Sequence, residues 1–386
     1  MGLKGREFAQ GERAAANLVF LLDVSGSMNT PQKLPLVKEA MRLLVGKLRA
    51  DDRVAIVTYA GASGLALPST MANRRGEIFA ALDALQPAGS TNGAMGIHLA
   101  YDIAKANLVV GGINRVILCT DGDFNVGTTN QGDLGRLIAE QAKSGVFLTG
   151  LGFGTGNYQD DTMEQLANKG NGNYGYIDSV REARRLLVDQ VDGTLATIAK
   201  DVKIQVEFNP AQVAAYRLIG YENSLRAKED FNNDEKDGGE IGAGHSVTAL
   251  YEVVLAGRSA EGTRNRLDEL RYGSETNPPV RAEVNHELLT VKVRAKAPDG
   301  DVSERWEFPL IDGGASFAET TPDFKFASAV AGFGMLLRDS AFRGETTFSR
   351  VLVWAESGMA NDPTGYRQEF LDLVRKAEVL HRTKRG

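Results

Sequence analysis

The sequence predicts an α/β protein with a doubly wound, mainly parallel sheet, followed by an antiparallel β-sheet or sandwich and by C-terminal helices. Between residues 17 and 200, short apolar runs alternate with segments whose apolar residues recur at helical spacing. From about residue 201 the apolar period becomes two, which is typical of half-exposed strands. The helical period returns from residue 323. At 386 residues the chain is long enough for about two domains.

The first strand is expected at residues 18–22, where a run without any polar side chain predicts a strand buried on both faces. Further strands are expected at residues 53–59, 64–67, 115–120, 146–151 and 174–177. The short 64–67 strand follows a tight connection, so we expect it to form an antiparallel edge. Helices are expected near residues 31–51, 77–85, 93–104, 133–143 and 162–168, with a last one ending at about residue 199. This alternation implies a mainly parallel sheet.

The second half begins with residues 201–208, where apolar positions 202, 204, 206 and 208 alternate with polar ones. The same pattern occurs at residues 216–221, 247–255, 288–293 and 305–310, and it predicts an antiparallel sheet or small sandwich. Helices near residues 326–337 and 351–357 precede a last helix. The expected apolar stripe of that helix consists of Phe370, Leu373, Val374, Ala377 and Leu380.

These changes of pattern predict three regions. They are an α/β domain at residues 16–199, a β-rich domain at residues 200–312 and a helical segment at residues 313–386. For residues 1–15 we hypothesise a strand and linker, with the strand pairing with the later sheet.

Composition excludes several classes of partner and chemistry. The 44 basic and 50 acidic side chains give a net charge of -6 without a basic patch, so no nucleic-acid partner is expected. No apolar run reaches the 18 or so residues of a membrane span. The single cysteine, Cys119, lies in an apolar run, which predicts a buried structural thiol. The four histidines are scattered and Gly-x-Ser-x-Gly is absent, so neither a zinc enzyme nor a nucleophile elbow is supported.

A candidate metal site follows the first strand, where Asp23-x-Ser25-x-Ser27 places one carboxylate and two hydroxyls on a tight loop. Burying Asp23 at the end of an apolar strand is costly unless a cation or several donors meet it. Hard oxygen ligands of this kind suit Mg²⁺, with Mn²⁺ or Ca²⁺ as alternatives. A capped helix start would also use Ser and Asp, but it would not need further ligands.

Two more residues are expected at the same place. Asp121 ends the fourth strand, and strands one and four are neighbours if the sheet has the dinucleotide-type order 3-2-1-4-5-6. Thr91 lies in the loop before the helix that starts near residue 93 and can reach the same crevice. The set Asp23, Ser25, Ser27, Thr91 and Asp121 leaves at least one position of an octahedral Mg²⁺ for water or for a partner's carboxylate.

Asp23-Val-Ser25-Gly-Ser27, Thr91 and Thr120-Asp121-Gly together resemble the von Willebrand factor type A domain over about residues 16–199. The resemblance implies that these five residues form the metal-ion-dependent adhesion site of that family, as ligands of Mg²⁺ directly or through water. It also implies a non-enzymatic adhesion module, in which an Asp or Glu of a protein partner completes the coordination.

Residues 199–210, 216–223 and 240–245 are similar to a bacterial subgroup in which a region of unknown function follows the von Willebrand domain. Members of that subgroup usually carry a further N-terminal region and an export or lipoprotein signal. The resemblance therefore implies a bacterial cell-envelope or extracytoplasmic protein from which these parts have been removed.

Other interpretations stay open beside this one. The chain could be an intracellular assembly factor for an ATPase complex or, with less support, a metal-dependent phosphohydrolase; Ser25 stands where the haloacid-dehalogenase type needs a second Asp. Gly152-x-Gly154 lacks the last glycine of a dinucleotide fingerprint. Residues 230–241 begin like an EF-hand loop, but Glu235 and Ile241 occupy the positions that need Gly and Glu.

Overall fold

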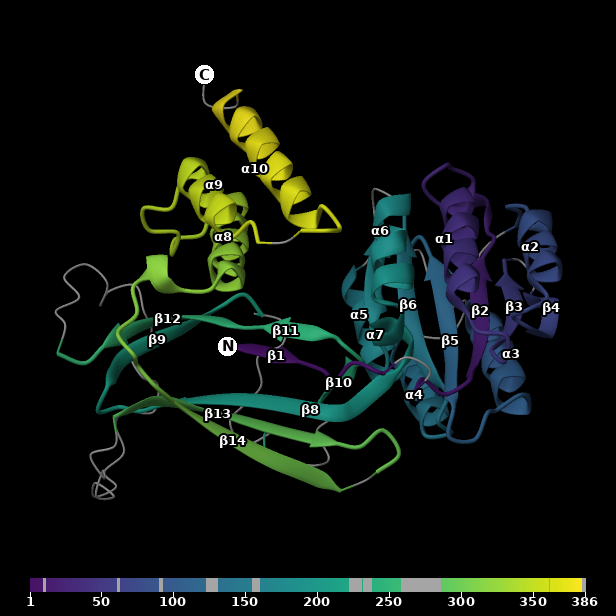
Figure 1. Ribbon diagram of the computed structural model, residues 1–386. Coiled ribbons are helices and arrows are strands. Elements are labelled where there is room, and N and C mark those ends of the chain that lie inside the picture. The colour runs from purple at the N-terminus through teal and green to yellow at the C-terminus, as the bar shows by residue number, and fades with distance from the viewer. Residues whose placement is uncertain are drawn as a thin grey trace.

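A computed structural model describes most of the chain, and Figure 1 shows an α/β part beside a β-rich part with the C-terminal helices next to the latter. The described residues are 1–9, 12–60, 63–89, 93–122, 131–154, 160–221, 231, 238–257, 286–300, 302–360 and 362–383. No helix among them is long and apolar enough to cross a membrane.

The α/β part contains a six-stranded sheet in the order β4-β3-β2-β5-β6-β7. The strands are β2 (Ala16–Asp23), β3 (Arg53–Tyr59), β4 (Ser63–Met71), β5 (Ile113–Thr120), β6 (Phe147–Phe153) and β7 (Tyr174–Ile177). All neighbours pair in parallel except β3 and β4. The predicted doubly wound sheet, its strand order and its antiparallel edge are thus confirmed. β4 is longer than expected, because only two of the nine residues of this edge strand are buried and its last four residues, Pro-Ser-Thr-Met, carry little apolar signal.

Helices cover both faces of this sheet (Figure 1). One face packs against α1 (Leu34–Lys47), α2 (Arg75–Ala84) and α6 (Val180–Arg184). The other packs against α3 (Gly93–Ala106), α4 (Gln131–Ala142) and α5 (Asp160–Lys169). Successive side chains of β2 enter opposite cores, because strand residues alternate in direction: Leu18, Phe20 and Leu22 on one face, Val19 and Leu21 on the other. This is why residues 18–22 of the strand include no polar side chain.

The end of the α/β part differs from the sequence prediction. The single helix expected to reach about residue 199 is three short pieces: α6, the π-helical turn η2 (Arg185–Asp189) and α7 (Val191–Leu195). Strand β8 (Thr197–Phe208) then begins four residues earlier than the expected start at residue 201. Its first residues pair with β10 (Gly239–Gly242), with Thr197 opposite Gly242. This long-range pairing overrides a local pattern that is compatible with either structure.

The β-rich part is antiparallel, as predicted. A four-stranded sheet has the order β10-β8-β13-β14, with β13 at Glu287–Lys296 and β14 at Ser303–Ile311. A separate pair joins β12 (Leu250–Leu255) to β9 (Val213–Ile219). The strand expected at 247–255 is therefore divided, and its first part, β11 (Ser246–Thr248), pairs instead with the N-terminal strand β1 (Gly2–Lys4).

Three helices follow: α8 (Pro322–Leu337), α9 (Phe348–Ser357) and α10 (Tyr366–Thr383). The apolar stripe predicted for the last helix is partly wrong, since Leu373 is 51% and Leu380 is 66% exposed. Leu371 and Val374 are the buried residues of α10, and they join Ala329, Val351 and Ala355 in a small core. The helix has more apolar residues than its narrow seam against α8 and α9 can bury, so spacing alone did not select the correct ones.

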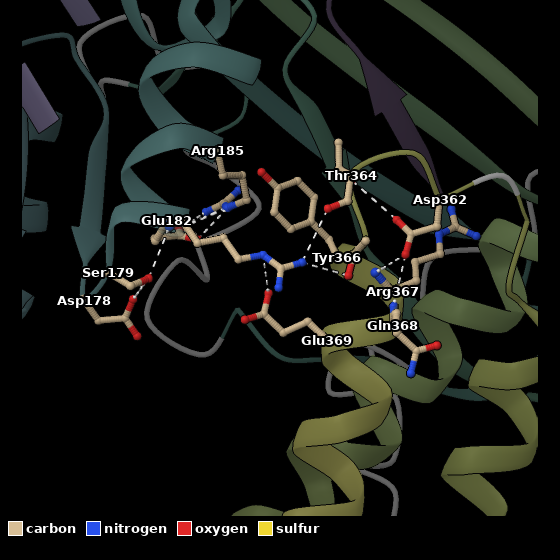
Figure 2. A network of polar contacts seen from close by, with 12 residues as sticks. Asp178, Ser179, Glu182, Arg185, Asp362, Thr364, Tyr366, Arg367, Gln368 and Glu369 are labelled. Carbon is tan, nitrogen blue, oxygen red and sulfur yellow. Dashed lines mark hydrogen bonds and ion pairs between the residues drawn. The ribbon is translucent and has the colours of Figure 1, made fainter. Parts of the chain in front are cut away.

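A surface network of polar contacts joins the start of α10 to the last helices of the α/β part (Figure 2). Arg181 donates to the carbonyl oxygen of Gly365 at 3.0 Å and forms an ion pair with Glu369 at 3.3 Å. Tyr366 donates its phenol hydrogen to Asp189 Oδ2 at 2.7 Å. The C-terminal helices are therefore attached to the α/β part by side chains far apart in sequence.

Candidate metal centre

Asp23 lies at the carboxyl end of β2, is fully buried, and accepts hydrogen bonds on both carboxylate oxygens. The amide of Ser25 donates to Oδ1 at 2.9 Å. The hydroxyls of Tyr59 and Thr120 donate to Oδ2, each at 3.2 Å. These two residues end β3 and β5, the strands on either side of β2. Parallel neighbours thus supply the donors that a buried carboxylate needs.

Burial is the main cause of the pKa shifts of Asp23 and Tyr59. It raises the pKa of Asp23 above its ordinary value; the hydrogen bonds from Ser25 and Thr120 oppose that change, and the nearby charge of Asp121 adds to it. Burial also raises the pKa of Tyr59 far above its usual range, and the charge of Asp23 contributes. Tyr59 therefore keeps its proton and acts as a donor.

The two serine hydroxyls lie on the short turn between β2 and α1, with 3.0 Å between Ser25 Oγ and Ser27 Oγ. The neighbouring loop holds this turn through two backbone hydrogen bonds, from Gly26 to Gly89 at 3.1 Å and from Ala88 to Val24 at 2.7 Å. Thr91, the predicted ligand farther along that loop, lies outside the described residues. Two hydroxyl oxygens this close together can contact one cation.

Asp121 follows β5 directly, and β5 pairs with β2 so that Cys119 lies opposite Leu22. Its carboxylate is 4% exposed and forms an ion pair with Lys33, with 2.7 Å between Nζ and Oδ2. The same ammonium donates to the carbonyl oxygen of Ser27 at 3.0 Å. Lys33 thereby connects the serine loop to the end of β5. Its positive charge contacts two residues of the predicted metal-binding set, Ser27 and Asp121.

Sequence reasoning missed three participants: Tyr59, Thr120 and Lys33. For Tyr59 and Thr120 the available signal was a hydroxyl at the last position of each strand that flanks β2. For Lys33 it was a basic residue just before the first helix, close in sequence to Asp23. Both signals become informative only when the strand order is known.

The donor set suits a hard divalent cation. It consists of carboxylate and hydroxyl oxygens, which Mg²⁺, Mn²⁺ and Ca²⁺ prefer. In the described part of the chain, no three His, Cys, Asp or Glu side chains cluster to hold a metal. Hydroxyls would therefore have to supply part of any ligand set here.

Cys119 is fully buried on β5, which confirms the predicted buried thiol, and burial raises the pKa of that thiol. Gly154, from the weak glycine motif, packs against the side chain of Lys33. Most of the EF-hand-like segment at residues 230–241 lies outside the described residues.

A doubly wound sheet with acidic and hydroxyl groups at the ends of its two central strands defines the von Willebrand factor type A class. The chain matches the family model of the von Willebrand factor type A domain over residues 17–190, and this part belongs to that family. Residues 193–380 match the family described as "Uncharacterized protein YfbK, C-terminal".

The full-length relatives share these parts to different extents. Uncharacterized protein YfbK of Escherichia coli is 44% identical over 367 residues, which cover 95% of this chain but only 62% of the relative. Human inter-alpha-trypsin inhibitor heavy chain H1 is 25% identical over 307 residues, 76% of this chain and 31% of that protein. A solved von Willebrand factor type A structure from Catenulispora acidiphila aligns over 95% of this chain and 83% of its own, at 15% identity and a TM-score of 0.47.

Proposed function

We propose that the α/β domain is a metal-dependent protein-binding module. Asp23, Ser25, Ser27, Thr91 and Asp121 hold a Mg²⁺ ion, directly or through water, and an Asp or Glu side chain of a partner protein supplies the last oxygen. The observation that carries the proposal is that the Lys33 ammonium bridges the backbone carbonyl oxygen of Ser27 and the Asp121 carboxylate, and so ties the turn that carries the Ser25–Ser27 hydroxyl pair to the end of β5.

The two carboxylates support different parts of this role. Asp23 accepts hydrogen bonds from three donors, which fix the position of its carboxylate. One of these donors is the backbone amide of Ser25, so Asp23 in turn fixes the geometry of the serine loop. Asp121 forms an ion pair with the long side chain of Lys33. Because a lysine side chain has several rotatable bonds, its ammonium can move away and a metal ion can take its place. Mg²⁺ retains coordination positions that protein ligands do not fill, and a carboxylate from another protein suits such a position.

The environment of Asp23 argues against a hydrolase. Oδ1 and Oδ2 of Asp23 both accept hydrogen bonds from buried groups, which stabilise its charge and suit a carboxylate that orients the loop and meets a cation better than a nucleophile. The hydroxyl of Ser25 lies 3.0 Å from that of Ser27, and in the described part of the chain no histidine or lysine side chain forms a hydrogen bond with it as a base would. The domain is therefore proposed to bind rather than to react.

Thermal unfolding during a Mg²⁺ titration tests the metal site. A ligand that binds only the folded state stabilises it by about 2.7 kcal/mol at a concentration 100 times its Kd, so the midpoint should rise with Mg²⁺. Asp121→Asn and Ser27→Ala should lose most of this rise. Asp83→Asn, which removes an equal charge from an exposed site beside Arg42, should keep it. Identical responses in all four proteins would contradict the proposal.

The partner's contribution needs a separate measurement. Crystals grown with MgCl₂ should show a metal bound at the five residues, with an acidic side chain of a neighbouring or added protein on the remaining position. A metal whose coordination is completed entirely by this chain would leave no place for a partner and would rule out that half of the proposal.

A further inference from the structure

Lys33 occupies a defined place beside the proposed metal site. It is the residue just before α1, and its amide donates to the carbonyl oxygen of Thr30 at 3.0 Å while its carbonyl accepts from Val37 at 2.8 Å. The backbone of this lysine is therefore fixed at the start of the helix. Its ammonium reaches Asp121, 88 residues farther along the chain, and its side chain is only 20% exposed.

The aliphatic part of Lys33 lies in a space that a glycine leaves open. A Cβ atom at Gly154, just after β6, would come within 2.8 Å of Lys33 Cε and 2.9 Å of Cγ. Gly154 has a φ of +91°, a backbone conformation that residues other than glycine rarely adopt. The end of β6 thus provides a groove for the lysine side chain, and this groove directs its ammonium toward Asp121.

The ammonium and a metal ion compete for the same carboxylate. A Mg²⁺ ligated by Asp121 Oδ2 lies about 2.1 Å from that oxygen, so an ammonium kept in its present position would lie within about 5 Å of the metal. Two cations at this distance repel each other, most strongly where water is largely excluded. Asp121, at 4% side-chain exposure, also needs a counter-charge when no metal is bound.

We propose that Lys33 is a resident counter-cation: it neutralises Asp121 in the metal-free protein, and a divalent cation must displace it. The inference rests on the proposed metal-binding function and deepens it, because it assigns to Lys33 the control of metal affinity. The lysine lets the domain fold without metal and weakens metal binding, so the site fills only when the free metal concentration is high enough to exchange one cation for the other.

Calorimetric titration of the metal-free protein with Mn²⁺ alone tests this assignment. Lys33→Met keeps an unbranched stem for the groove at Gly154 but removes the charge, and we expect it to bind Mn²⁺ about tenfold more tightly than the wild type. Lys33→Gln, which keeps a donor for Ser27, should do the same and covers the case in which the Met variant folds poorly. Lys38→Met is the control: Lys38 lies on α1, five residues after Lys33, but its ammonium contacts the carbonyl oxygens of Asp83 and Leu85.

Thermal unfolding supplies a second readout. Without metal, both Lys33 variants should unfold at a lower temperature than Lys38→Met, and saturating Mn²⁺ should raise their midpoints by more than that of the wild type. Equal or weaker Mn²⁺ affinity in the Lys33 variants would overturn the role of Lys33 while leaving the metal site intact. Absence of Mn²⁺ binding in every protein would overturn both proposals, whereas binding in the Lys33 variants alone would support strong competition.

Discussion

Tyr59, at the end of β3, donates its phenol hydrogen to Oδ2 of Asp23 at the end of β2, with 3.2 Å between the two oxygens. Both side chains are fully buried. A buried carboxylate that loses a donor is destabilised, so the loop that presents Ser25 and Ser27 depends on a residue that is not itself a ligand.

Replacing Tyr59 by Phe should therefore lower the free energy of unfolding of the metal-free protein by about 1 kcal/mol, the usual value of one hydrogen bond. The stabilisation by Mg²⁺ should remain, because the proposed ligands are intact. Tyr101→Phe is a matched control: Tyr101 is also buried, but its hydroxyl has no hydrogen-bond partner within the described structure. Urea unfolding of both variants should show a loss for Tyr59 alone; equal losses would contradict the role of the Tyr59 hydroxyl.

Gly96 on α3 controls how closely that helix approaches Tyr59. A Cβ atom at this position would come within 2.8 Å of Tyr59 Cβ and 3.1 Å of Leu21 Cδ1. Gly96→Ala should cost about 1 to 3 kcal/mol of unfolding free energy, as overpacking of a core does. Gly46→Ala on α1, where nothing lies within 4 Å, should instead stabilise the protein by about 0.5 to 1 kcal/mol. A Gly96 variant as stable as the Gly46 variant would show that the contact is readily relieved.

The central sheet could be predicted because its strands are buried on both faces and carry a continuous apolar signal. β2 shows this clearly, since all eight of its residues are buried. The edge strand β4 and the start of β8 could not be predicted as well. In β4 residues 68–71 have no alternating apolar pattern, and in β8 the first residues become a strand only through pairing with the distant β10.

The same distinction applies to the candidate site. Asp23, Ser25, Ser27 and Asp121 carry local signals, because polar residues follow apolar runs. Their meeting required only the strand order, which the sheet confirms. The ion pair of Lys33 with Asp121 depends on the path of a flexible side chain past Gly154, and no local pattern contains that information.

Arg115 on β5 joins the α/β sheet to the first strand of the β-rich part. Its guanidinium is almost completely buried and donates to Thr149 Oγ1 at 2.7 Å and to Thr197 Oγ1 at 3.1 Å. Arg115→Ala removes a charged donor from two threonine hydroxyls, and a hydrogen bond to a charged group contributes about 1.5 to 3 kcal/mol. Urea unfolding should show this loss, while Arg136→Ala, at an exposed site on α4, should change stability by less than about 0.5 kcal/mol. A small effect at Arg115 would mean that the two parts hold together without it.

The hydrogen bond from Tyr366 to Asp189 should make the junction between α10 and the α/β part sensitive to alkaline pH. Burial raises the pKa of Tyr366 to about 12, and the hydrogen bond to Asp189 and its charge contribute. A tyrosine in the unfolded chain ionises near pH 10, so the folded state retains the proton more strongly than the unfolded state. The stabilisation is therefore fully present below about pH 10 and is lost as the pH rises toward 12.

The wild type should accordingly be more stable than Tyr366→Phe at pH 8, and this difference should shrink by pH 11.5. Thermal midpoints of both proteins across this range provide the measurement, with Asp189→Asn expected to reduce the pH dependence. Parallel pH profiles for wild type and Tyr366→Phe would show that this contact does not hold the C-terminal helices to the α/β domain.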